Sequence, residues 1–139
     1  MFSFFKKENN NENFESFSKI ACLLIHAAKI DQTYTKKEQE IIKKTLINLG
    51  AEVATIDKLI SNAIIIEENS NQILDFTREI KNAPNSEKIK IVESIWKIIY
   101  SDKNNDMFED NLMRRLAGLL YIDAKTMGEL KEKVKKINK

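Results

Sequence analysis

Turn-forming residues are so scarce in this chain that they constrain its fold more than any motif does. Three glycines and one proline occur among its 139 residues. A β-sandwich or β-barrel needs frequent turns, which clusters of such residues usually mark. The scarcity therefore argues against a β-fold and leaves helices as the main element. The length fits one domain, large enough to bury roughly two-thirds of its unfolded surface.

The same scarcity excludes several kinds of functional site. The glycines, Gly50, Gly118 and Gly128, stand too far apart to form a phosphate-binding loop. Cys22 is the only cysteine, so neither a zinc finger nor a disulfide framework is possible within the chain. Any nucleophile–base group that needs an imidazole would have to use His26, the only histidine. We therefore expect a non-enzymatic protein and, because the sequence has a lone cysteine and no export signal, a cytoplasmic one.

The charges of the chain are nearly balanced overall but uneven along it. Lysine and arginine total 23 and the acids 21, for a net charge of +2, so we expect no nucleic-acid partner. The last fifteen residues contain six lysines, which alternate with apolar side chains. This pattern predicts an amphipathic helix that docks on the domain and turns a lysine face to solvent. A basic contact surface is the alternative interpretation.

The chain begins with an apolar and basic segment that precedes the predicted domain. We expect residues 1–11 to be loosely ordered and residues 12–139 to form a single helical domain. No stretch approaches the 18 apolar residues of a membrane span. A second hypothesis is peripheral contact with a membrane surface, in which the phenylalanines insert and the lysines meet anionic lipid. The residues concerned are Phe2, Phe4, Phe5, Lys6 and Lys7.

Hydrophobic periodicity predicts a compact all-α bundle of about seven helices. The first is apolar on most sides and is therefore expected at the centre. Thr35 and Glu38 form a capping-box pattern at the start of the second. The expected helices cover about 12–30, 35–49, 51–68 and 71–82, then one capped by Ser86, one containing Leu112–Leu120, and one starting at Asp123 or Thr126.

An offset of 71 residues superimposes two helix–loop–helix units of the chain. Each unit has an apolar helix that ends in aspartate, a short connection to a capping residue, and a glutamate three residues later. Such a repeat predicts two similar halves packed face to face. The matching pairs are Asp31 with Asp102, Thr35 with Asp106, and Glu38 with Glu109.

The repeated acids have two interpretations. An aspartate at the C-terminal end of a helix faces the negative end of the helix dipole and needs a compensating partner. The two glutamates lie on the core-facing stripes of their helices. In the first interpretation all four acids only cap helices and organise turns. In the second they converge on an all-oxygen site for Mg²⁺ or Ca²⁺, with Asp31, Glu38, Asp102 and Glu109 as ligands.

Two smaller constellations are expected to be structural. Cys22 and His26 are four residues apart, a spacing that can bind metal, but an isolated pair indicates ordinary packing. Glu93 and Arg115 border the apolar stripes of their helices, which predicts an ion pair between the fifth and sixth helices.

At these same residues the chain resembles the tellurite-resistance protein TerB superfamily. The resemblance covers roughly residues 14 to 138 and is more specific in the second half. It rests on the segment Ala21–Asp31 followed by Glu38, and on Glu93-x-x-Trp96, Asp102, Glu109 and Arg114-Arg115. It differs where the family has glycine after each loop aspartate, because Gln32 and Lys103 stand there. Lys103 can supply a positive charge of its own.

The resemblance implies a compact all-helical domain that is linked to tellurite and chemical-stress responses. It also implies a metal-binding surface at the acidic loops and partner or membrane-associated complexes, and it carries over no catalytic mechanism. We therefore expect a non-enzymatic interaction module that binds a protein partner or itself, with a weak divalent-cation site. The alternatives are a metal-assisted enzyme that uses the same carboxylates and a purely structural or oligomerising adaptor.

Overall fold

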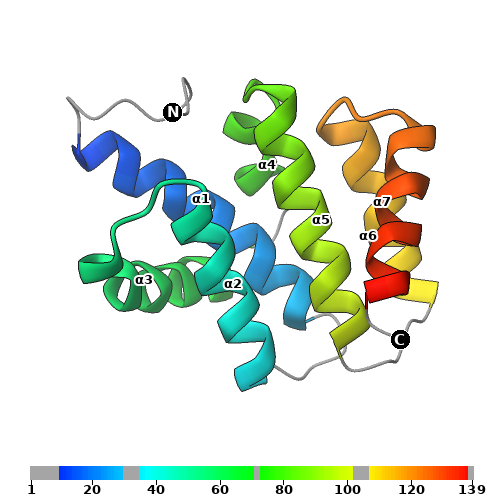
Figure 1. Cartoon of the computed structure of the whole chain (residues 1–139). Coiled ribbons are helices and arrows are strands. Elements are labelled where there is room, and N and C mark those ends of the chain that lie inside the picture. The colour runs from blue at the N-terminus through cyan, green and yellow to red at the C-terminus, as the bar shows by residue number, and fades with distance from the viewer. Residues whose placement is uncertain (1–9, 30–34, 71–72, 102–106, 138–139) are drawn as a thin grey trace.

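The computed structural model describes residues 10–29, 35–70, 73–101 and 107–137 (Figure 1). These ranges contain seven α-helices, the 3-10 helix η2 and no strand, which confirms the predicted all-α class. The elements are α1 (Asn10–Ala28), α2 (Lys36–Asn48), η2 (Val53–Thr55), α3 (Ile56–Glu68), α4 (Leu74–Ile80), α5 (Asn85–Ser101), α6 (Met107–Leu119) and α7 (Ala124–Ile137).

Several helix ends differ from the predicted ones. Helix α1 begins at Asn10, two residues before the expected start, and the expected first turn of the third helix is η2. Helix α5 begins at Asn85, so Ser86 lies inside its first turn and does not cap it. The cause is Pro84, whose carbonyl accepts the backbone N–H groups of Glu87 and Lys88 at 3.0 and 3.1 Å. Proline suits the start of this helix, because no intrahelical hydrogen bond there needs the N–H that proline lacks.

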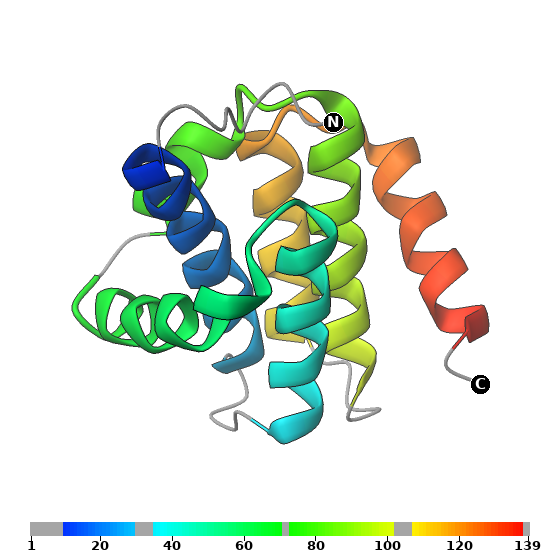
Figure 2. The ribbon, with the colours of Figure 1, turned by 60° about the vertical axis from the view of Figure 1, so that its left-hand side comes forward.

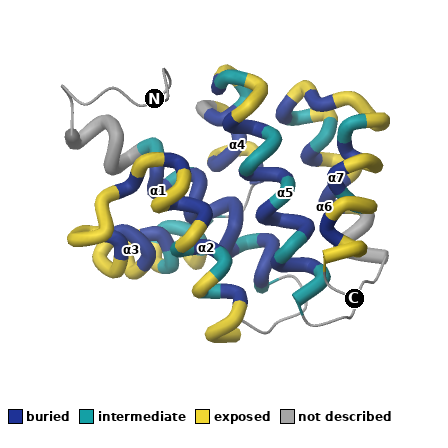
Figure 3. Tube along the Cα trace, viewed as in Figure 1, coloured by how far each residue is buried: buried dark blue, intermediate teal, exposed yellow. Residues whose placement is uncertain are grey.

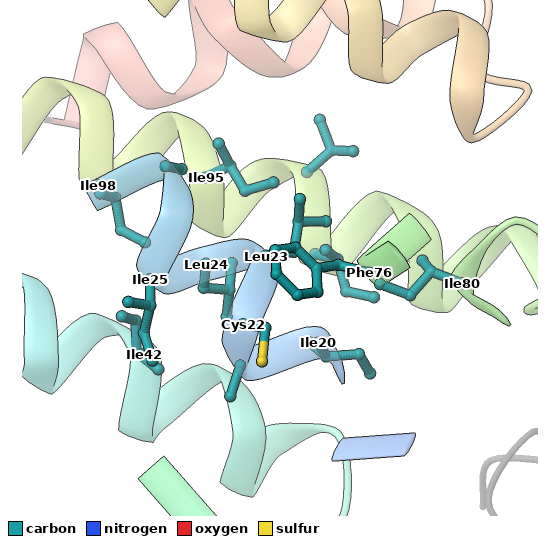
Figure 4. Close-up of a cluster of buried hydrophobic side chains, with 14 of the residues drawn as sticks. Ile20, Cys22, Leu23, Leu24, Ile25, Ile42, Phe76, Ile80, Ile95 and Ile98 are labelled. Carbon is teal, nitrogen blue, oxygen red and sulfur yellow. The ribbon is translucent and has the colours of Figure 1, made fainter. Parts of the chain in front are cut away.

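Helix α1 is the centre of the bundle, as its apolar sequence predicts. It packs against α2, α3, α4 and α5. Six consecutive residues, from Ile20 to Ile25, have no exposed surface, so this part of the helix is buried on every side (Figure 3). Figure 4 shows how neighbours surround it: Ile42 comes from α2, Phe76 and Ile80 from α4, and Ile95 and Ile98 from α5.

Helix α5 is the second organising element, because it packs against α1, α2 and α7. Apolar side chains make most of these contacts, but one polar contact joins it to α2. The hydroxyls of Thr45 and Ser94 form a buried hydrogen bond of 2.6 Å. A buried pair of this kind satisfies two groups that would otherwise lose their water partners.

Helix α7 is docked at one edge of the bundle, as predicted for the lysine-rich tail (Figure 2). Asp123 immediately precedes it and caps its start, because the Asp123 side chain accepts the N–H of Thr126 at 3.1 Å. Its apolar side chains Met127, Leu130 and Val134 are buried, and its lysines face outward except for partly buried Lys131.

The expected ion pair between α5 and α6 is wrong. Among the described residues, Glu93 pairs with Lys97 of its own helix at 3.7 Å and with Lys133 of α7 at 3.3 Å. Arg115 is exposed and makes no pair with Glu93. The reason is that α7 and not α6 packs along this side of α5.

The two hairpins of the predicted repeat occupy matching positions in the chain. Helix α6 has the bounds of α2 moved on by 71 residues at both ends. The surroundings differ, because α2 packs against α1, α3 and α5, whereas α6 contacts α4 and α7. That the two halves share one three-dimensional arrangement stays a prediction.

A buried lysine joins the ends of two other helices. Lys88 is only 6% exposed, and its Nζ donates to the carbonyl of Leu120 at 2.8 Å and to that of Lys81 at 3.4 Å. Each carbonyl lies one residue beyond the end of a helix, α6 and α4 respectively. A cation there compensates the negative ends of both helix dipoles.

We predict that Lys88→Met lowers the free energy of unfolding by about 1.5–3 kcal/mol, the usual contribution of charged hydrogen bonds. Methionine keeps the length of the side chain but leaves both carbonyls without this donor. Urea unfolding measures the change, and Lys44→Met on the exposed side of α2 is the matched control. Equal midpoints for the two variants would show that Lys88 does not hold these helix ends.

Candidate functional site

The start of α2 carries the one predicted site residue whose side chain the structure places. The Thr35 hydroxyl accepts the N–H of Glu38 at 3.1 Å, and the Glu38 Oε1 accepts the N–H of Thr35 at 2.7 Å. This is a complete capping box, as the sequence predicts. Glu38 is 2% exposed, which also confirms that it lies on the core-facing side of its helix.

A contact between helices places the two ends that carry the acidic segments close together. The Nζ of Lys37, in the first turn of α2, donates to the carbonyl of Ser101 at 3.2 Å. Ser101 is the last residue of α5 and the immediate neighbour of Asp102 in the chain. Figures 1 and 2 show the start of α2 and the end of α5 at the same end of the bundle.

The other residues of the predicted cation site cannot be placed. Asp31 and Asp102 lie outside the described residues, as does the side chain of Glu109 in the first turn of α6. Within the described part of the chain, no three histidine, cysteine, aspartate or glutamate side chains form a group that could hold a metal ion. The four-residue cation site therefore stays a prediction.

The predicted membrane contact also falls outside the described residues, since all five of its residues precede Asn10. None of the helices in the described ranges is both long enough and apolar enough to cross a bilayer.

Cys22 and His26 are packing residues, as predicted, and each contacts α3. The Cys22 thiol donates to the carbonyl of Ala63 at 3.4 Å, and burial raises its pKa to about 12. The His26 Nδ1 lies 3.3 Å from the Glu67 Oε2, and the Lys29 Nζ lies 2.8 Å from the other oxygen of the same carboxylate. A thiol with this pKa is not a nucleophile at neutral pH, and the imidazole is joined to a structural ion pair.

Sequence reasoning missed a second buried carboxyl, that of Glu87 in the first turn of α5. It is 1% exposed, and its Oε2 has no hydrogen-bond partner among the described residues. Burial raises the pKa of this carboxyl, and the nearby charge of Lys90 opposes that effect only in part. The sequence does indicate the burial of Glu87. This residue stands four positions before Ile91 on a stripe that continues to Ile98, and both isoleucines are buried.

These features define the class as an all-α domain with a central buried helix, in which the start of α2 lies close to the end of α5. The family model described as tellurite resistance protein TerB matches residues 18–132. The chain therefore belongs to the TerB family, and the predicted resemblance is confirmed. No curated protein and no solved structure matches the chain significantly.

We predict that Thr35→Ala lowers the free energy of unfolding by about 1 kcal/mol, whereas Glu38→Gln changes it by a few tenths at most. Alanine removes the acceptor for the N–H of Glu38. Glutamine keeps an oxygen that can accept the N–H of Thr35 and removes only the charge. Thermal and urea unfolding of both variants tests this, and a large loss with glutamine would mean that the charge itself holds the helix start.

We predict that Glu87→Gln raises the free energy of unfolding at pH 7 by about 0.5–1 kcal/mol, part of the cost of a buried unpaired group. The folded protein holds the proton of Glu87 more tightly than the unfolded chain, whose carboxyl has its ordinary pKa near 4.5. The cost of the charge is therefore complete above the raised pKa and absent well below 4.5.

Unfolding measured from pH 3 to pH 8 should show the difference between Glu87→Gln and wild type shrinking as the pH falls. Glu129→Gln, at an exposed position of α7, is the control with the same change in charge. A gain that is independent of pH would contradict the proposed cause.

Proposed function

We propose that this TerB-family chain is a non-enzymatic, cytoplasmic interaction module of a tellurite or chemical-stress response. Its partner is another protein or a second copy of the chain. It carries a weak site for Ca²⁺ or Mg²⁺ at the end of the bundle where α2 starts and α5 ends. The membership of the family supports the context, and the Lys37–Ser101 contact is the single observation that carries the position of the site.

The contacts of Cys22 and His26 support the non-enzymatic part of the proposal. These are the only thiol and the only imidazole in the chain. The thiol faces a backbone carbonyl in the core, and the imidazole faces Glu67. Acyl transfer and similar reactions need a nucleophile beside a general base, and neither residue is arranged for that role.

The electrostatics of the helix ends support a cation at the proposed site. The C-terminal end of α5 carries the negative end of a helix dipole, and an aspartate follows it in the sequence. Glu38 adds a buried carboxylate one turn into α2. Carboxylate and carbonyl oxygens are the ligands that Ca²⁺ and Mg²⁺ prefer.

Two features favour weak affinity. One oxygen of Glu38 already accepts the N–H of Thr35, so binding a cation there competes with the cap. The Lys37 ammonium already compensates part of the negative charge at the end of α5 and repels an arriving cation. We expect dissociation constants of about 1 mM, at the weak end of the range for calcium sites.

The complete capping box favours a second candidate function, a structural or oligomerising adaptor. In this account Glu38 acts on the backbone of Thr35 as a cap, and Lys37 and the Ser101 hydroxyl satisfy carbonyls at the end of α5. The two candidates differ in whether the repeated acids bind a cation.

Calorimetric titration of the metal-free protein with Ca²⁺, Mg²⁺, Mn²⁺ and Zn²⁺ separates these candidates. We predict millimolar binding of Ca²⁺ or Mg²⁺ that the double variant Asp31→Asn/Asp102→Asn abolishes and that Glu38→Gln weakens. The matched control is Asp57→Asn/Asp123→Asn, which makes the same change in charge on other helices. If the wild type binds no cation, the structural or oligomerising adaptor is the candidate that remains. If the double variant binds a cation as well as the wild type does, the site lies elsewhere.

A further inference from the structure

A groove with a volume of about 660 Å³ lies between α1, the end of α3 and α4. Its lining includes none of the residues that meet at the start of α2 and the end of α5. Its volume falls within the range of about 300–1,000 Å³ that is typical of ligand pockets. None of the interactions described for the acidic end uses it.

Apolar side chains form one part of this groove. Ile65 and Ile66 come from the last turns of α3, and Phe76 comes from α4. Phe76 is buried, Ile66 is half-buried, and Ile65 is 58% exposed. The groove therefore has a buried aromatic residue in its wall and an uncovered isoleucine beside it, which is suitable for one bulky apolar side chain of a partner.

Two cations form another part of the groove. Lys19 of α1 and Arg78 of α4 both line it, and neither forms an ion pair with another described residue. The acid in the lining, Asp75, has a carboxylate oxygen that accepts the Ser70 hydroxyl at 2.8 Å. By contrast, Lys29 and Lys133 are both paired with carboxylates. The lining therefore holds two positive charges and one negative charge, a net excess of one positive charge.

We propose that this groove binds a short peptide segment of a partner protein, in which acidic side chains flank one bulky apolar residue. The acids meet Lys19 and Arg78, and the apolar residue covers Ile65 and contacts Phe76. Arginine is suited to this role because its guanidinium binds a carboxylate through two parallel hydrogen bonds. The inference rests on the proposed function as an interaction module and names the surface and the chemistry of the partner.

A peptide fits the lining better than an anionic lipid chain does. Asn69 and Ser70 also line the groove, so polar groups interrupt its apolar part. The backbone of a peptide supplies donors and acceptors that polar side chains of this kind can meet, whereas an alkyl chain supplies none.

Selection from a displayed library of random short peptides tests the proposal with the full chain as bait. We expect the selected peptides to combine aspartate or glutamate with leucine, isoleucine or an aromatic residue. In fluorescence anisotropy, Lys19→Glu/Arg78→Glu should weaken their binding by about tenfold or more. The control Lys44→Glu/Lys58→Glu, which makes the same change on exposed positions of α2 and α3, should leave binding unchanged.

Ile65→Ser is the second variant, because this exposed side chain can change with little effect on folding. It should weaken the same peptides, and circular dichroism verifies that every variant stays folded. If the selected peptides lack acids, or bind the charge-reversed variant as well as the wild type, the proposal that this groove is the binding site is wrong. The proposed function as an interaction module would still stand. Selection of no peptide would count against both. Binding of dodecanoate in place of peptides would assign the groove to a lipid and overturn the proposal.

Discussion

The burial of α1 on every side from Ile20 to Ile25 is the constraint on which the rest of the structure depends. A stretch of helix without a polar face cannot lie at the surface, so α2, α3, α4 and α5 must each cover part of it. This need explains why the core runs continuously from Phe17 through the four surrounding helices. It also explains the chemistry of Cys22, since a thiol in the middle of such a helix has a raised pKa and no access to solvent. The acidic ends and the groove are both built on this arrangement.

Charged side chains at the helix ends are the second theme of the structure. Glu38 and Asp123 satisfy N–H groups at the starts of α2 and α7, while Lys88 and Lys37 satisfy carbonyls at the ends of other helices. A helix bundle leaves several such groups unsatisfied at every end, and in this chain charged side chains satisfy some of them. Charged residues near the core of this chain therefore have a structural role first. Any cation or partner must compete with that role, which is the physical basis of the weak affinity proposed for the acidic end.

How far the sequence predicted the site differs from residue to residue. The capping box and the inward direction of Glu38 were predictable, because both follow from local spacing along one helix. Glu87 lies on a stripe with the same spacing, but the neighbouring stripe through Val92 and Ile95 also predicts a core-facing side, and Glu87 is not on that stripe. The partner of Glu93 could not be predicted, because two helices were possible neighbours and only packing selects α7. The groove could not be predicted either, since Lys19, Ile65 and Arg78 lie on three helices without a common motif.

The sequence by itself determined the helical class, the order of the helices, the central place of α1 and the membership of the TerB family. The first three follow from periodicity, capping residues and scarce turn residues, all of which act over a few positions of the chain, whereas the family is shown by the model that matches residues 18–132. The tertiary structure decided which helix ends meet, which lysines are buried, and where cations remain beside apolar surface. Those features depend on the directions in which helices cross, and many small contacts between distant residues set these directions. Local patterns therefore describe each helix of this protein, while the surfaces that can bind a partner exist only after the helices pack.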